Sequence, residues 1–400
     1  MKSIRIIGFL LTLSLSSGIL TACQEKPFLF VKGEKVKFSV GSVGNRTKAA
    51  YADENTIPGE GDTKVRIDWE PGDLIRIYCA QASEPETHFA DYIVNAVEEG
   101  SGAVSKAKIQ QWGLEDKGLR WGEISDKHEF YAVYPSPINV DRQVVRTEDV
   151  FPGPSGKETT MTGVIEEVQR PASLVAGESV TYLAKADLTN EYMVAKKTVI
   201  AGEQTVDDGV FLQFKPIVTA IQFTIANDFI NDIKNDNVLH IRSIELTSKD
   251  HFISGKFSAF LDGLDEEGNL YPQCESVDGG HTVSMDFTGL EGGKISLEKG
   301  ETLRFTLFLK PEHDEDGPVD IDDLTFKVYR SDKSWVSTRL GYIDGTGVVF
   351  PCHKISYATG ILVPEGAVWT IGGKVTVTPW DTVKDADGND SFNASFEEKK

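Results

Sequence analysis

The sequence has little of what defines the common catalytic and metal sites. Its 400 residues include four cysteines and seven histidines, and the histidines are dispersed singly. It contains no G-x-S-x-G, H-E-x-x-H or P-loop motif, and no G-x-G-x-x-G after a strand. The acidic run Asp385 to Asp390 lacks the glycine and the final carboxylate of a calcium loop. We therefore expect no catalytic residue, no metal site and no cofactor, and a hydrolase assembled from separated loops is the weakest alternative.

The few cysteines exclude a disulfide framework. The neighbours of Cys23 indicate a separate role for it, which leaves Cys79, Cys274 and Cys352. Three cysteines form at most one disulfide. Cys79 ends an alternating apolar run, where a small buried hydrophobic residue is expected rather than a reactive thiol.

Positive charge is also scarce. The chain has 41 Lys and Arg against 62 Asp and Glu, a formal net charge of −21. Such a chain repels phosphate backbones and anionic lipid surfaces, so we expect no nucleic-acid partner. The acidity equally suits a soluble, exported surface that has no charged partner at all.

The one long apolar run lies at the start of the chain. Lys2 and Arg5 precede an apolar core from Ile6 to Leu15, the pattern of a secretory signal over residues 1–22. Leu20 to Cys23 resembles the bacterial lipobox, in which the cysteine is acylated, for instance by palmitate, and the chain is cut just before it. The alternative is an ordinary cleaved signal. No later segment approaches the roughly 20 apolar residues that cross a bilayer, so we expect an outer membrane lipoprotein held by Cys23.

What the sequence does have is alternation of apolar and polar residues. The period of two indicates strands with one buried face, separated by glycine-rich turns. We expect an all-β protein of two tandem antiparallel β-sandwich domains, over residues 23–205 and 206–383, and a charged, disordered tail over 384–400. The alternating runs are centred on Phe38, Ile67, Ile77, Ala132, Leu212, Phe223, Ala259, Phe305, Phe326 and Val375.

Several of these segments together resemble the fimbrillin family of type V pilins from Gram-negative anaerobes. The segments are the lipobox, KVKFSV, Arg46-Thr47, IDWEPGDLIRIY, FYAVYP, VFLQFKPIVTAIQFTI, SIELTSKDHFISGKF and VTVTPWDT. Their order and spacing cover nearly the whole chain after the signal. The resemblance implies two transthyretin-like β-sandwiches that polymerise into surface fimbriae. The chain departs from the family at Pro216, where many relatives have histidine, and in the charged tail.

The segment Lys35 to Val40 is expected to be a strand that buries Val36, Phe38 and Val40. A flexible basic stretch follows it up to Arg46 and Thr47. The resemblance implies that an arginine-specific protease cuts between these two residues and releases the lipid and the strand. A strand of the next subunit then fills the exposed groove.

The resemblance places the donor strand near the C-terminus, where Val375, Val377 and Trp380 are the candidates. The expected partners are other fimbrial subunits, the protease, and an unknown host or bacterial ligand. Alternatively, Arg46 is a solvated loop residue, and the strand stays in place permanently.

A second interpretation is a surface lipoprotein that does not polymerise and binds glycan. Trp112 and Trp121 flank a glycine-rich turn. They form either a core pair or an exposed platform on which a sugar stacks.

Overall fold

The structure is a computed structural model that describes the chain in segments. These are residues 31–43, 69–98, 104–113, 117–123, 127–136, 160–177, 182–200, 209–227, 238–261, 264, 273–276, 279–311, 319–320, 323–331, 335–339, 349–350, 354–365, 368–379 and 392–396. The predictions for Cys23, Arg46, Thr47 and Trp380 lie outside the described residues. Within these segments, no helix has the length and apolar character that crossing a membrane requires.

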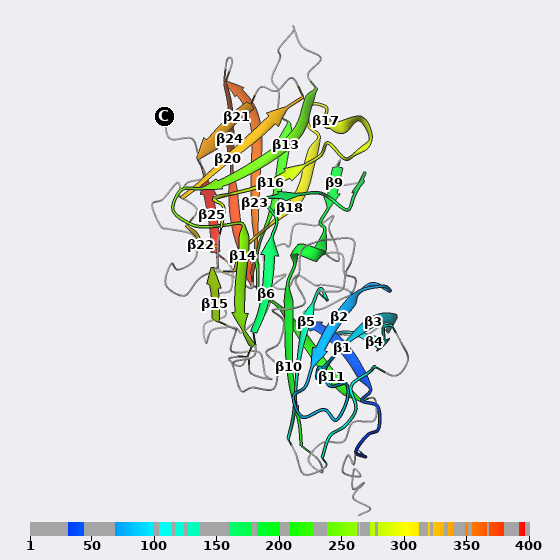
Figure 1. Ribbon diagram of the computed structural model, residues 1–400. Helices are drawn as coiled ribbons and strands as arrows, with labels where there is room; N and C mark the ends of the chain where they lie inside the picture. The colour runs from blue at the N-terminus through cyan, green and yellow to red at the C-terminus, as the bar shows by residue number, and fades with distance from the viewer. Residues whose placement is uncertain are drawn as a thin grey trace, which may run out of the picture.

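Strands dominate the described residues, so the all-β expectation is confirmed. The first unit is a closed barrel at one end of the molecule (Figure 1). Its interior is apolar because alternate residues of each strand, such as Ile75 and Ile77, face inward and are fully buried. Around the barrel the strands are β1 (Phe38–Val43), β11 (Val210–Pro216), β10 (Met193–Val199), β5 (His128–Tyr134), β2 (Leu74–Tyr78), β3 (Phe89–Glu98) and β4 (Val104–Gln111).

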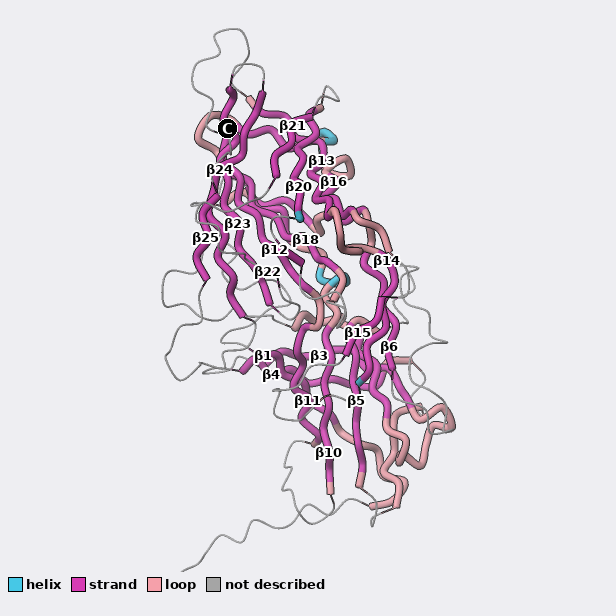
Figure 2. Tube along the Cα trace, turned by 90° about the vertical axis from the view of Figure 1, so that its left-hand side faces the viewer, coloured by secondary structure: helices cyan, strands magenta, loops and turns pink. Residues whose placement is uncertain are grey.

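Two larger sheets pack face to face at the other end (Figures 1 and 2). Phe223 and Phe305 of one sheet stack at 5.3 Å between ring centroids, and Phe223 lies 4.9 Å from Phe326 of the other sheet. The first sheet contains β25 (Phe392–Phe396), β24 (Val368–Pro379), β23 (Lys354–Glu365), β12 (Thr219–Asn227), β18 (Thr302–Leu309), β9 (Tyr182–Lys185) and β8 (Ser173–Val175). The second contains β21 (Trp335–Arg339), β20 (Leu324–Arg330), β13 (Leu239–Ser248), β16 (Thr282–Asp286) and β7 (Val168–Gln169), with β17 (Ile295–Leu297) beside β13.

The remaining elements are small. A three-stranded sheet lies between the barrel and the sandwich (Figure 1), and a two-stranded ribbon is separate from it. Within the described segments, 3₁₀ turns include η2 (Leu188–Asn190) and η4 (Glu291–Gly293). The sheet contains β15 (Gln273–Ser276), β14 (Gly255–Phe260) and β6 (Thr160–Ile165), and the ribbon contains β19 (Val319–Asp320) and β22 (Val349–Phe350).

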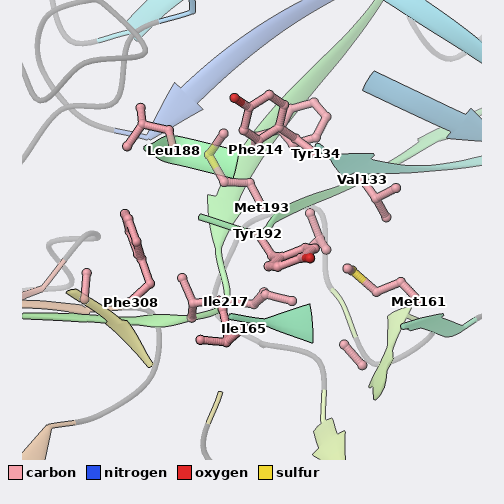
Figure 3. Close-up of a cluster of buried hydrophobic side chains, with 14 of the residues drawn as sticks. Val133, Tyr134, Met161, Ile165, Leu188, Tyr192, Met193, Phe214, Ile217 and Phe308 are labelled. Carbon is pink, nitrogen blue, oxygen red and sulfur yellow. The ribbon is translucent and has the colours of Figure 1, made fainter. Parts of the chain in front are cut away.

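The buried cluster between the barrel and the sandwich is continuous. Figure 3 shows Tyr192, Ile165, Ile217 and Phe308 close together in it. The Tyr192 hydroxyl donates to the Val164 carbonyl at 3.1 Å and accepts from the Val164 amide at 3.1 Å. Because Tyr192 directly precedes β10 and Val164 lies in β6, this contact joins a barrel strand to the three-stranded sheet.

The strand pairing does not follow the domain boundary that the sequence suggested. The expected boundary between residues 205 and 206 falls before β11, which pairs with β1 and β10 inside the barrel. Conversely, β6, β7 and β9 precede the boundary and pair with β14, β16 and β18, which follow it. Polar composition near residue 205 marks a connection between strands, and such a connection does not have to separate two domains. A transthyretin-like topology for each unit stays a prediction.

The tail was expected to be disordered over residues 384–400, and part of it is a strand. β25 pairs antiparallel with β24, with Phe392 opposite Val377 and Phe396 opposite Gly373. Phe392, Ala394 and Phe396 alternate with Asn393 and Ser395. This period of two is the strand signal, which the surrounding charges obscured.

A candidate assembly site at the first strand

The first strand is flanked by a partner on each side. β1 pairs antiparallel with β4, from Ser39 opposite Lys108 to Val43 opposite Val104. It pairs parallel with β11, from Phe38 opposite Val210 to Ser42 opposite Phe214. Because it is paired on both sides, β1 is not an edge strand. Its removal would open the barrel and leave unpaired edges on β4 and β11.

The residues before β1 continue the attachment. Val36 donates its amide to the Leu119 carbonyl at 2.9 Å, and Gly33 donates to the Trp121 carbonyl at 2.8 Å. Arg120 Nη1 donates to the Gly33 carbonyl at 2.8 Å. Lys35, the first residue of the expected strand, forms an isolated β-bridge with Arg120, and the strand itself begins at Phe38.

The three apolar side chains predicted to be buried are buried. Val36 is 6% exposed, Phe38 is 5% exposed and Val40 is fully buried. The Phe38 ring makes edge contacts with Tyr92 at 5.1 Å and with Phe130 at 5.3 Å between centroids. The segment thus fills an aromatic pocket in the barrel, and each such side chain contributes roughly 1.5 to 3 kcal/mol.

A glycine allows β11 to approach this segment closely. Gly209 has φ +92°, and a Cβ atom there would lie 2.4 Å from the Lys37 carbonyl oxygen. The same carbonyl accepts the amide of Val210 at 2.8 Å. A residue with a side chain at position 209 would push the two strands apart, so this glycine is part of the site.

The candidate donor residues lie in the other unit. Val375 and Val377 belong to β24, which pairs with β23 on one side and β25 on the other. In this chain, therefore, the strand completes its own sheet. The structure does not bring these residues beside β1, since β24 pairs with no barrel strand in the part of the chain that the structure describes.

Two acidic residues at one end of the barrel could not be recognised from the sequence: Asp73, which is partly buried, and Glu191, which is fully buried. Asp73 accepts the Glu70 amide at 2.8 Å and the Tyr134 hydroxyl at 3.2 Å. Burial raises the pKa of the Asp73 carboxyl to about 6, although these hydrogen bonds act in the opposite direction. Burial also raises the pKa of Glu191 well above its usual range, and neither of its carboxylate oxygens has a hydrogen-bond partner among the described residues. The local sequence Tyr134-Pro135 does not indicate that the Tyr134 hydroxyl forms a hydrogen bond with Asp73.

A buried ion pair supports the same barrel wall. Arg76 Nε lies 2.9 Å from Asp91 Oδ1, and Arg76 Nη2 lies 2.8 Å from Asp91 Oδ2. The guanidinium carbon is 4.3 Å from the centroid of the Phe89 ring. A bidentate pair of this kind fixes the register of β2 against β3, where the two residues are direct cross-strand partners.

The structure contradicts the interpretation in which Trp112 and Trp121 form an exposed platform for a sugar. Trp121 is 3% exposed and packs against His128 at 5.2 Å and Phe130 at 5.6 Å between centroids. Trp112 is 41% exposed. The chain folds Trp121 into the aromatic core next to Phe38, so only one of the two indoles is available to a ligand.

Two further expectations concern thiols and metals. Cys79 is fully buried and free, and burial raises the pKa of its thiol to about 12, so it is the inert core residue that was predicted. Across the described segments, no three His, Cys, Asp or Glu side chains gather where a metal ion could bind.

The chain is similar to several solved structures at low sequence identity. No protein-family model and no curated protein matches the sequence. A protein from Bacteroides ovatus proposed to act in cell adhesion aligns with a TM-score of 0.45 and 12% identity, over 88% of this chain and 99% of that one. A fimbrial assembly protein from Parabacteroides distasonis aligns with a TM-score of 0.38 and 8% identity, over 90% and 98%.

A fimbrial protein from Bacteroides vulgatus aligns with a TM-score of 0.39 and 11% identity, over 77% of this chain and 93% of that one. The three similar structures are thus of proteins described as acting in cell adhesion, in fimbrial assembly or in fimbriae.

Proposed function

We propose that this protein is a fimbrial subunit, exported as a precursor with a lipid on Cys23 and held in the outer membrane at the cell surface. An arginine-specific protease cuts between Arg46 and Thr47. The cut subunits then polymerise into a fimbrium by strand exchange, with each unit built as a transthyretin-like β-sandwich or a closed variant of it. The role is structural and adhesive, with no catalysis.

The observation that carries the proposal is the position of β1 between β4 and β11. β1 precedes Arg46 in the chain, and every other strand of the barrel follows it. After a cut at Arg46, no covalent bond would connect β1 to the barrel. The strand would then be held only by its hydrogen bonds and by the pocket around Phe38.

A released β1 would leave a groove suited to one kind of occupant. The groove has an unpaired edge on β4, an unpaired edge on β11, and an apolar floor that includes Tyr92 and Phe130. An extended strand with alternating apolar residues satisfies both the backbone groups and the pocket. A donor from another subunit generates an open filament, because a head-to-tail contact does not close.

The candidate donor is the C-terminal strand that contains Val375 and Val377, extended to Trp380. The segment alternates apolar residues with threonine in VTVTP, the pattern that a groove with one apolar side accepts. In the monomer this strand pairs with β23 and β25, so it would have to leave both before it could pair with the β4 and β11 edges of another subunit.

The test is proteolysis of the purified precursor that lacks the signal. We expect an arginine-specific protease to produce a chain beginning at Thr47, and heat-sensitive oligomers to appear as a ladder on a denaturing gel. The matched control is Arg46→Lys, which keeps the charge but resists this protease, and it should remain monomeric after the same treatment.

Two results would contradict the proposal. One is a chain cut at Arg46 that keeps its first strand and stays monomeric. The other is a ladder that forms equally well in Arg46→Lys. The first result would favour the alternative, a surface lipoprotein that does not polymerise and binds glycan.

A further inference from the structure

The outer face of the sandwich sheet around β13 and β20 carries an ordered polar surface. Ile244, Leu246, Phe326 and Val328 point inward and are fully buried. The alternate residues point outward, and Glu245 of β13 is the direct cross-strand partner of Lys327 of β20. β13, β20 and β21 lie at the opposite end of the molecule from the barrel that contains β1 (Figure 1).

Glu245 organises this surface. Lys327 Nζ donates to Glu245 Oε1 at 2.8 Å, and the Tyr329 hydroxyl donates to Glu245 Oε2 at 3.1 Å. Thr247 Oγ1 adds a longer contact to Oε1 at 3.4 Å. The side chains of Lys327 and Glu245 are only 29% and 22% exposed, so the network is held in place while its outer side stays open to solvent.

An exposed indole adjoins the network. Trp335 of β21 is 55% exposed and is the cross-strand partner of Tyr329, so both side chains lie on the same face of the sheet. The Lys327 ammonium is 5.9 Å from the centre of the Trp335 ring. A large aromatic surface open to water beside fixed donors and acceptors is typical of a binding surface.

The charge of the surface selects the class of ligand. Lys327 and Glu245 form an ion pair at 2.8 Å, so their opposite charges offset each other. The hydrogen bond with Glu245 is also the largest cause of the raised pKa of Lys327. The chain as a whole has a formal charge of −21, which repels polyanions. An ammonium has three N–H donors, of which Glu245 takes one, so donors remain for the hydroxyls of a ligand.

We infer that this face binds a neutral carbohydrate. A pyranose ring stacks its C–H groups on the negative π face of Trp335, and its hydroxyls bond to Lys327, Glu245 and Tyr329. We define the carbohydrate surface as Glu245, Lys327, Tyr329 and Trp335. The inference goes beyond the proposed assembly, because the surface is complete in the uncut monomer.

The experiment is native gel electrophoresis of the full chain through gels containing a soluble polysaccharide. The neutral probes are α-mannan, galactomannan and mixed-linkage β-glucan, and polygalacturonate is the anionic comparison. We expect at least one neutral probe to slow migration, and Trp335→Ala to weaken that binding roughly tenfold or more. Glu245→Gln should weaken it by a smaller factor, because the amide keeps only one acceptor oxygen.

The matched control is Trp112→Ala, since Trp112 is a second exposed indole, 41% exposed, on the barrel. It should leave binding unchanged, and circular dichroism should confirm that both alanine variants are folded.

The inference is overturned if no neutral probe slows the chain, or if the two variants behave alike. It is also overturned if polygalacturonate binds as strongly as the neutral probes, or if Trp335→Ala only converts a dimer to a monomer. The uncut chain is used for this experiment. A failure to bind carbohydrate would therefore leave the polymerisation proposal intact, and a failure to polymerise would leave the carbohydrate surface intact.

Discussion

At the scale of the residue, tryptophan side chains are buried in one part of the molecule and exposed to solvent in another. Trp121 is 3% exposed beside Phe130, whereas Trp335 is 55% exposed beside Tyr329. Trp121 follows a glycine-rich turn, and Trp335 begins the strand β21. The difference arises from which neighbouring strands cover each residue, so it could not be read from the local pattern.

Asp73 is the clearest case of a residue whose chemistry depends on its surroundings. Burial raises its pKa from 3.8 to about 6. Below pH 3.8 the carboxyl is protonated in both the folded and the unfolded chain. As the pH rises towards 6, the unfolded chain releases this proton first, so the free energy of unfolding falls through that window.

We predict that Asp73→Asn removes this loss of stability. Relative to the parent, the free energy of unfolding should rise by about 1 to 3 kcal/mol between pH 4 and pH 7, because the amide has no proton to release. Urea unfolding at several pH values measures the difference. A difference that stays constant across this range would contradict the prediction.

At the scale of the element, β1 combines a local pattern with a distant partner. Val36, Phe38 and Val40 were predicted to be buried from their spacing alone, and they are buried. The parallel pairing with β11, however, joins Phe38 to Val210. A parallel pair requires a long crossover connection, and nothing in either strand specifies which partner it will find.

We predict that Phe38→Ala destabilises the uncut chain by about 3 to 5 kcal/mol, because it leaves a cavity between Tyr92 and Phe130. Chemical denaturation followed by fluorescence measures the change. Val31→Ala is the matched control, since Val31 is 60% exposed and should change stability by less than about 0.5 kcal/mol. Similar effects for the two variants would show that β1 does not fill a packed site.

At the scale of the whole molecule, the barrel and the sandwich share stretches of sequence. β11 follows residue 205 and closes the barrel, while β6, β7, β8 and β9 precede it and belong to the other sheets. Tyr192 and Val164 connect the two parts by a reciprocal pair of hydrogen bonds. A cut at the expected boundary therefore divides both units.

We predict that a fragment of residues 23–205 does not fold by itself. It lacks β11, so β1 and β10 each lose a neighbour, and it carries β6, β7 and β9 without their partner strands. Near-UV circular dichroism and urea unfolding should show no cooperative transition, in contrast to residues 23–400. A sharp unfolding transition in the fragment would mean that the barrel closes without β11.

The sequence by itself determined the all-β class, the positions of several strands, and the burial of Val36, Phe38, Val40 and Cys79. These follow from a period of two and from short motifs, which act over a few neighbouring residues. Only the tertiary structure decided the closure of the barrel and the place of β1 between β4 and β11. It also decided the raised pKa of Asp73, and which tryptophan faces solvent. Each of these depends on contacts between strands that are distant in the chain, and such contacts are set by how the sheets pack.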